Sequence, residues 1–149
     1  MSVGRTYTLM WYLALPFILG RLIWRSFKAP GYRSHIHERL GFIKPINNEK
    51  PCLWIHAVSL GESIAATPLI KALLQSSEFH LLITNTTPTG RARIAQEFGG
   101  RVSQAWAPYD IPACIERFLI SAKPCGLIII ETELWPNWLQ ACRRRNIPS

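Results

Sequence analysis

The chain has 149 residues, which is enough for one domain with a hydrophobic core and too few for two full domains. Hydrophobic residues make up 48% and charged residues 17%, a composition that argues against intrinsic disorder and is compatible with membrane contact. Most of the net charge of +8 lies in the N-terminal part of the chain. Residues 1–50 hold eight Lys and Arg against two Glu, whereas residues 51–149 hold nine Lys and Arg against seven acidic residues. Such asymmetry points to an anionic partner, either lipid or nucleic acid.

The sequence gives no sign of a metal or a cofactor. The chain has a single aspartate, Asp110, and its histidines do not fall at metal-ligand spacing. It contains neither G-x-G-x-x-G nor the P-loop pattern, so a dinucleotide or P-loop nucleotide site has no support. The four cysteines form no C-x-x-C pair, and we expect them to be thiols in a reducing cytoplasm: Cys52, Cys114, Cys125 and Cys142.

Residues 6–24, "TYTLMWYLALPFILGRLIW", predict an apolar helix of about the minimum length that crosses a bilayer. Positive residues follow this segment more than they precede it, which predicts a domain on the cytoplasmic side of the membrane. No small-x-small cleavage pattern follows, so we expect an uncleaved anchor within residues 1–28. Pro16 would kink a spanning helix, and a helix in the membrane interface or packed on the protein itself stays open.

Residues 29–51 carry Gly, Pro and Asn, and they predict a linker with one short helix at 33–40. From residue 52 onward apolar runs alternate with helical spacing. We expect strands at 52–58, 80–86, 102–108 and 126–133, each followed by a helix. Four successive βα units predict an α/β fold, a Rossmann-like parallel sheet with helices on both faces, over residues 52–149. The final "NIPS" should begin a fifth strand, so we expect the sequence to be the N-terminal part of a longer protein.

Three predicted turns carry chemically useful residues: "SLGES", "TPTG" and "ETELWPN". In a parallel sheet such turns meet at the carboxyl ends of the strands, where ligands bind. Glu62 follows Gly61 at a helix start, where a carboxylate either caps the helix or takes a proton from a hydroxyl. His56, near the end of the preceding strand, either orients Glu62 or is an ordinary core histidine. Thr87 to Gly90 offers hydroxyls and N–H groups that suit a phosphate or sugar, or forms only a turn.

Glu131 and Glu133 alternate at the end of the fourth predicted strand, so we expect their side chains to point to opposite sides of the sheet. Only one of them should then lie with Glu62. The structural alternative for these glutamates is a salt bridge to one of the arginines at 143–145.

Five motifs in this order and spacing resemble the Kdo transferases, which transfer 3-deoxy-D-manno-octulosonic acid (Kdo). The motifs are "APGYRSHIHERLGF" (29–42), "HAVSLGE" (56–62), "TPTG" (87–90), "PYDIP" (108–112) and "ETELWPN" (131–137). The resemblance implies the N-terminal half of a GT-B glycosyltransferase, preceded by a membrane-anchor helix. It implies transfer of Kdo from CMP-Kdo to a lipid A precursor, lipid IVA, in lipopolysaccharide core biosynthesis, without a metal and with inversion.

Carried over by residue, the resemblance makes Glu62 the general base and Glu131 the group that stabilises the transition state. The acceptor-binding residues that we expect beside them are Ser59, Gly61, Thr87, Thr89 and Gly90. The expected partners are the lipid A precursor, CMP-Kdo and the inner membrane, and not nucleic acid. The resemblance places the donor site mainly in a C-terminal domain that these residues do not include, so we expect the chain alone to be inactive. The alternative is a membrane-attached lipid-binding or scaffold module without catalysis.

Overall fold

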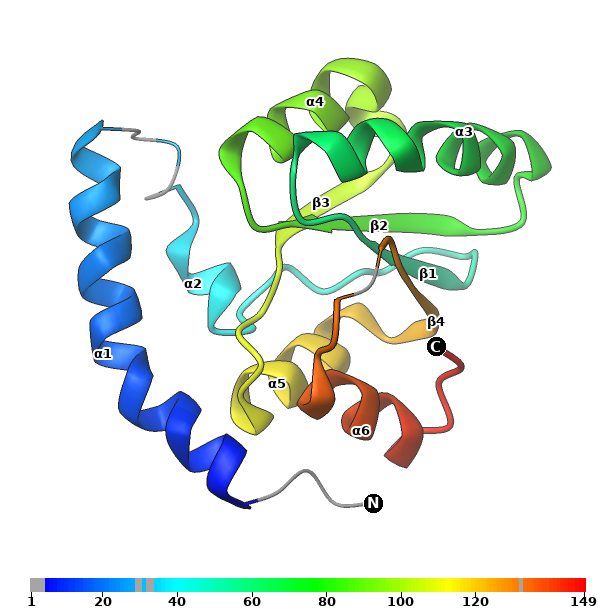
Figure 1. Cartoon of the computed structure of the whole chain (residues 1–149). Helices are drawn as coiled ribbons and strands as arrows, with labels where there is room; N and C mark the ends of the chain where they lie inside the picture. Colours follow the sequence, from blue (N-terminus) through cyan, green and yellow to red (C-terminus); the bar gives the residue numbers. More distant parts are fainter. Residues whose placement is uncertain (1–4, 29–30, 32–33, 132) are drawn as a thin grey trace.

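The computed structural model describes residues 5–28, 31, 34–131 and 133–149. Its centre is a parallel sheet of four strands in the order β3-β2-β1-β4. The strands are β1 (Cys52–His56), β2 (His80–Asn85), β3 (Ser103–Trp106) and β4 (Pro124–Ile129). Helices α3 (Leu60–Ser76) and α4 (Pro88–Phe98) cover one face of the sheet, and α5 (Pro112–Ala122) and α6 (Pro136–Arg144) cover the other (Figure 1). This arrangement confirms the predicted α/β, Rossmann-like fold.

Strand β1 runs between two hydrophobic cores because successive side chains of a strand point to opposite faces. Leu53 and Ile55 belong to the core under α3 and α4. Cys52 and Trp54 belong to the core against α5 and α6. His56 continues this second set, since its ring contacts aromatic rings of the β4–α6 connection and α6.

The fourth strand is shorter than the sequence predicts. It ends at Ile129, although the apolar run continues to Ile130. Glu131 has a φ of 67°, a left-handed conformation that a strand does not contain. The expectation that Glu131 and Glu133 alternate across the sheet is therefore wrong, because neither residue lies in a strand. Beyond α6, the Leu127 N–H donates to the Pro148 carbonyl over 2.9 Å, so the last residues run beside β4, as a fifth strand would.

Much of the segment expected as a linker packs against the domain. Helix α2 (Ile36–Arg39) is shorter than the helix expected at 33–40, whose first residue lies outside the described residues. The Glu38 carboxylate accepts from the Trp106 N–H and pairs with Arg91 at 2.9 Å. Arg39 is buried, lies over the Trp106 ring and donates to the Thr86 carbonyl. These contacts tie α2 to the end of β3 and to the β2–α4 turn.

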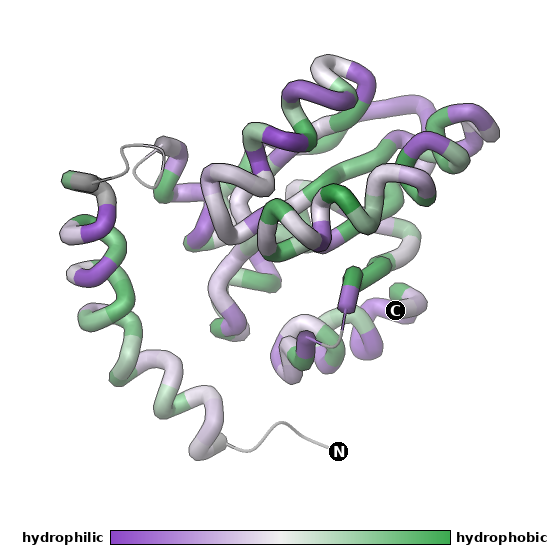
Figure 2. Tube along the Cα trace, turned by 45° about the horizontal axis from the view of Figure 1, so that its top comes forward, coloured by the Kyte–Doolittle hydropathy of each residue, from purple (hydrophilic) through white to green (hydrophobic). Residues whose placement is uncertain are grey.

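Helix α1 (Arg5–Lys28) lies along one side of the domain (Figure 1). One face packs on the domain, where Trp11 contacts the Tyr109 ring and the Tyr7 hydroxyl donates to Asp110 over 2.6 Å. The opposite face is apolar and exposed, and Leu13 and Phe17 are 65% and 80% exposed. Figure 2 shows this hydrophobic character along the middle of α1. By length and composition, Thr6–Arg25 is the one candidate membrane span in the described part of the chain.

Candidate functional site

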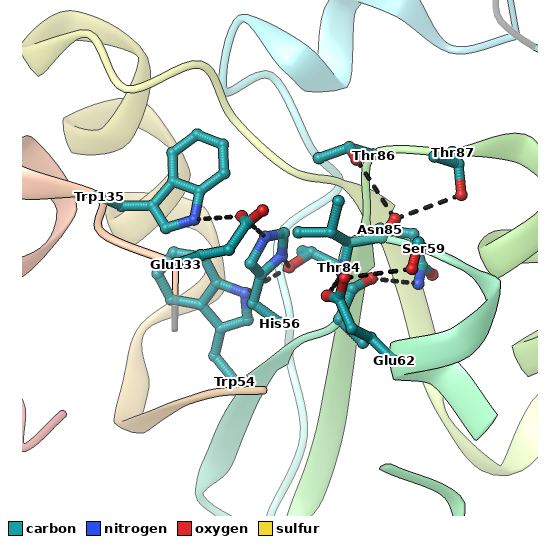
Figure 3. A network of polar contacts seen from close by, with 12 residues as sticks. Trp54, His56, Ser59, Glu62, Thr84, Asn85, Thr86, Thr87, Glu133 and Trp135 are labelled. Atoms are coloured by element: carbon teal, nitrogen blue, oxygen red, sulfur yellow. Dashed lines mark hydrogen bonds and ion pairs between the residues drawn. The ribbon is translucent and has the colours of Figure 1, made fainter. Parts of the chain in front are cut away.

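The polar residues of the site gather at the carboxyl edge of the sheet, where β1, β2 and β4 lead into three connections (Figure 3). Parallel pairing places His56 of β1 beside Thr84 of β2 and beside Ile129 of β4. The three turns that the sequence singled out therefore leave the sheet at one edge. The carboxylates of Glu62, Glu131 and Glu133, called here the carboxylate cluster, come from two of these connections.

Glu62 is the third residue of α3, and its side chain turns back over the helix start. One carboxylate oxygen accepts from the Val58 N–H and the other from the Ser59 hydroxyl, over 3.1 Å for the latter. Such contacts satisfy donors at a helix start, so the capping role that the sequence left open is present. Glu62 is 8% exposed, and each oxygen retains a second lone pair for another donor. The same group can therefore cap the helix and accept a proton from a substrate hydroxyl.

His56 is fully buried and faces Glu133 rather than Glu62. The Trp54 indole N–H donates to the Thr84 hydroxyl over 2.8 Å, and that hydroxyl lies 2.9 Å from His56 Nδ1. Burial disfavours the imidazolium and lowers the pKa of His56 to about 4, and a backbone hydrogen bond with Thr84 opposes this shift. His56 is thus a neutral ring at physiological pH.

Glu133 lies between the His56 ring and the Trp135 indole (Figure 3). It accepts from Trp135 Nε1 over 3.0 Å, and its Oε2 is 4.0 Å from His56 Nε2. Burial raises the pKa of Glu133, the Trp135 bond opposes this shift, and the carboxylates of Glu62 and Glu131 raise it further. Glu133 is therefore the carboxylate that lies near both of the others, and the expectation that only one of Glu131 and Glu133 lies with Glu62 stays a prediction.

Glu131 is exposed in this structure, and it sits where the chain bends away from β4. The ion pairs suggested for Glu131 or Glu133 do not form among the described residues, because Arg144 and Arg145 pair with Glu116 instead. The carboxylate cluster therefore has no Lys or Arg ion-pair partner within the described parts of the chain. Carboxylates that lie together without a cationic partner need hydrogen-bond donors from the protein or from a ligand.

The predicted acceptor-binding residues occupy the first turns of α3 and α4. Ser59 uses its hydroxyl on Glu62, and Thr87 caps α4 by accepting from the Gly90 N–H over 3.2 Å. A Cβ at Gly90 would lie 3.0 Å from backbone atoms of Ser59, so Gly90 allows the two helix starts to touch. Gly61 and Thr89 are exposed beside these turns. The structure thus brings all five residues to one edge of the sheet and shows internal hydrogen bonds for four of them, since the Thr89 hydroxyl also donates to the Thr87 hydroxyl.

Asp110 is a structural residue of the site that sequence reasoning did not single out. It is fully buried, and its carboxylate accepts from the N–H groups of Asn137 and Trp138 and from Tyr7. It therefore caps α6 from a different connection and holds the end of the "ETELWPN" motif against the domain and α1. Burial raises the pKa of Asp110, while these hydrogen bonds oppose the shift. The sequence could have indicated this role, because Asp110 is the only aspartate of the chain and lies within the "PYDIP" motif.

Metal binding is not indicated, since no group of three or more His, Cys, Asp or Glu side chains is arranged around a common point in the described ranges. All four cysteines are free, and only Cys125 is exposed.

Comparison with known protein families shows the family to which the chain belongs. The model of the 3-deoxy-D-manno-octulosonic-acid transferase (kdotransferase) family matches residues 34–149. The chain belongs to this family. The match includes the three turns and Asp110 as well as the packed segment around α2.

Individual relatives carry the same name. A 3-deoxy-D-manno-octulosonic acid transferase of Haemophilus influenzae is 42% identical over 95% of this chain and 34% of its own length. One from Bordetella pertussis is 48% identical over 64% of this chain and 23% of its own length. A probable mitochondrial 3-deoxy-D-manno-octulosonic acid transferase of Arabidopsis thaliana is 35% identical over 98% of this chain and 33% of its own length. The chain thus spans about a third or less of these relatives.

Proposed function

We propose that this chain is the acceptor-binding part of a GT-B glycosyltransferase that transfers Kdo from CMP-Kdo to a lipid A precursor. The observation that carries the proposal is the family match across residues 34–149, which contains the whole carboxylate cluster. The relatives are named as Kdo transferases. The donor site belongs, in this proposal, to protein beyond the matched third of those relatives.

In the proposed reaction Glu62 acts as the general base. Its carboxylate takes the proton of an acceptor sugar hydroxyl while the hydroxyl oxygen attacks the anomeric carbon of Kdo. The bond from that carbon to the phosphate of CMP breaks, and CMP leaves with the electron pair, which inverts the configuration. The Val58 N–H and the Ser59 hydroxyl support this role, because they hold both oxygens of Glu62 in place before substrate binds.

Glu131 has a different part in the proposal. The anomeric carbon becomes electron-poor as the bond to phosphate lengthens, and a nearby carboxylate stabilises that positive charge. Glu131 is exposed on the bend after β4 and acts electrostatically on Glu133, so it belongs to the same cluster. The turns at Ser59 and Gly61 and at Thr87 to Gly90 would contact the acceptor beside it.

The membrane part of the proposal concerns α1. Its inner face packs on the domain and its outer face exposes large apolar residues, which is the pattern of a helix lying in the membrane interface. The basic excess of residues 1–50 would attract anionic headgroups on the cytoplasmic side of the inner membrane. A lipid acceptor would then be delivered at the surface where α1 binds.

The test is transfer of Kdo from CMP-Kdo to lipid IVA by membranes that contain the chain, with mass spectrometry of the lipid. The chain is assayed alone and joined to the remaining C-terminal part of the Haemophilus influenzae relative. A gain of one Kdo mass with the joined protein supports the proposal. If the joined protein folds and binds CMP-Kdo but forms no product, the alternative of a membrane-attached lipid-binding or scaffold module replaces it.

A further inference from the structure

Beside the carboxylate cluster lies a hollow of about 400 Å³. Tyr7 and Trp11 of α1 form one wall, and the segment from Glu133 to Trp135 forms the other. The lining combines aromatic rings with one carboxylate. Such a lining suits a ligand that has both apolar C–H surfaces and hydroxyl groups.

The Glu133 carboxylate is held from behind by one ring donor, and a second ring nitrogen lies near it. Trp135 Nε1 donates to it, and the Trp135 ring is itself fixed by stacking on Trp138 with centroids 4.4 Å apart. His56 Nε2 faces the same oxygen at 4.0 Å, a distance too long for a hydrogen bond. His56 Nε2 is buried and has no hydrogen-bond partner among the described residues.

A buried polar nitrogen without a partner costs free energy, so a native site keeps one only where a partner arrives. A shift of Glu133 by about 1 Å toward His56 would bring this pair to hydrogen-bond distance. A ligand in the hollow that donates to Glu133 from the front would favour such a shift.

The electrostatics of the cluster select the ligand further. Glu133 lies within reach of the charges of Glu62 and Glu131, so an anionic group in the hollow would be repelled. A hydroxyl donor has no such penalty, and its proton stabilises the carboxylate against its two neighbours. The hollow therefore favours the neutral, hydroxylated face of a sugar ring over a phosphate or carboxylate group.

We propose that this hollow binds a sugar ring of the lipid acceptor, with Glu133 accepting a hydrogen bond from a ring hydroxyl and Trp135 packing against the ring. Glu133 is then a third functional carboxylate beside Glu62 and Glu131. The identity of the ring as part of a glycolipid rests on the proposed function. It is supported by α1, which forms one wall of the hollow and exposes Leu9 and Leu13 for contact with lipid.

The test is binding of the full chain to vesicles, without CMP-Kdo. Partition into phosphatidylglycerol vesicles that contain lipid IVA is compared with partition into phosphatidylglycerol vesicles alone. We expect Glu133→Gln to weaken the lipid IVA-dependent binding about tenfold, the loss for one hydrogen bond to a charged group. Binding to the plain vesicles should not change. Glu78→Gln, which removes an exposed carboxylate elsewhere, is the matched control.

A second variant guards against a change that acts through folding. Trp135→Phe keeps an aromatic ring but removes the N–H that holds Glu133, and it should weaken lipid IVA binding several-fold. Unchanged lipid IVA binding by both variants overturns the inference, as does wild-type binding that is equal with and without lipid IVA. If Kdo transfer fails, the proposed function is wrong but the binding result for the hollow still stands. If Glu133→Gln transfers Kdo normally with an unchanged KM for lipid IVA, the proposed role of Glu133 is wrong and the proposed function stands.

Discussion

Acidification should destabilise this domain through His56. The ring is fully buried and neutral, with a folded pKa of about 4 against 6.5 for an unperturbed histidine. Between these two pKa values the unfolded chain binds a proton at His56 and the folded chain does not. The contribution of the neutral ring to the free energy of unfolding is therefore fully present above pH 6.5 and is lost as the pH falls toward the folded-state pKa of about 4. Linkage for this single group gives a loss of about 2 kcal/mol in the free energy of unfolding between pH ~7.5 and pH ~5.

The assay is urea unfolding followed by circular dichroism at both pH values, for the wild type and for His56→Gln. Glu133 and Asp110 have raised pKa values and act in the opposite direction, because a carboxyl with a raised folded pKa gains stability on acidification. Only the difference between the two proteins therefore isolates His56. His80→Gln is a matched control, since burial also lowers the pKa of His80 but its ring is only partly buried. Equal pH dependence in wild type and His56→Gln would refute the reasoning.

Three further changes test the packing around the site. Asp110→Asn should lower the free energy of unfolding by about 2 kcal/mol in urea unfolding, because it weakens the cap of α6 and the bond from α1; an unchanged value would contradict that role. Gly41→Ala should cost about 3 kcal/mol, since φ is +89° and the new Cβ would lie within 2.1 Å of a carbonyl oxygen of α5, whereas Gly61→Ala should be tolerated. In vesicle sedimentation, Phe17→Ala on the exposed face of α1 should weaken binding to anionic vesicles about tenfold. Leu15→Ala on the inner face should instead lower the free energy of unfolding. The reverse pattern would show that the two faces of α1 are misassigned.

The alternation of strands and helices was predictable because each buried strand is an apolar run and each helix begins at a recognisable residue. Pro112 and Pro136 both stand at helix starts, where a missing N–H costs nothing, whereas α4 begins at Pro88, inside the motif that was read as a turn. The end of β4 was not predictable, because Ile130 continues the apolar run and the left-handed bend at Glu131 is not at a glycine. Sequence periodicity therefore extended the strand and separated two carboxylates that lie in one cluster.

The contacts that bind α1 and α2 to the domain could not be predicted from local sequence. The pairing of Tyr7 with Asp110 spans 103 positions, and that of Glu38 with Trp106 spans 68. An apolar helix also gives no indication of which face will meet protein and which will stay exposed. Glu62 was identified at once from its motif, but its capping contacts with Ser59 and Val58 required coordinates. The function of Glu62 as a base stays a prediction.

The most direct test of the account replaces Glu62 with Gln in the protein joined to the C-terminal part of its Haemophilus influenzae relative, and measures the kcat for Kdo transfer to lipid IVA. Gln keeps the size of the side chain and one oxygen that accepts from the helix start, so the free energy of unfolding should fall by no more than about 1 kcal/mol. The account predicts a loss in kcat of at least about 100-fold, because the general base is removed, with Glu78→Gln as active as the wild type. A kcat within a few-fold of the wild type in a folded Glu62→Gln protein would mean that Glu62 only caps helix α3, and the central claim would be wrong.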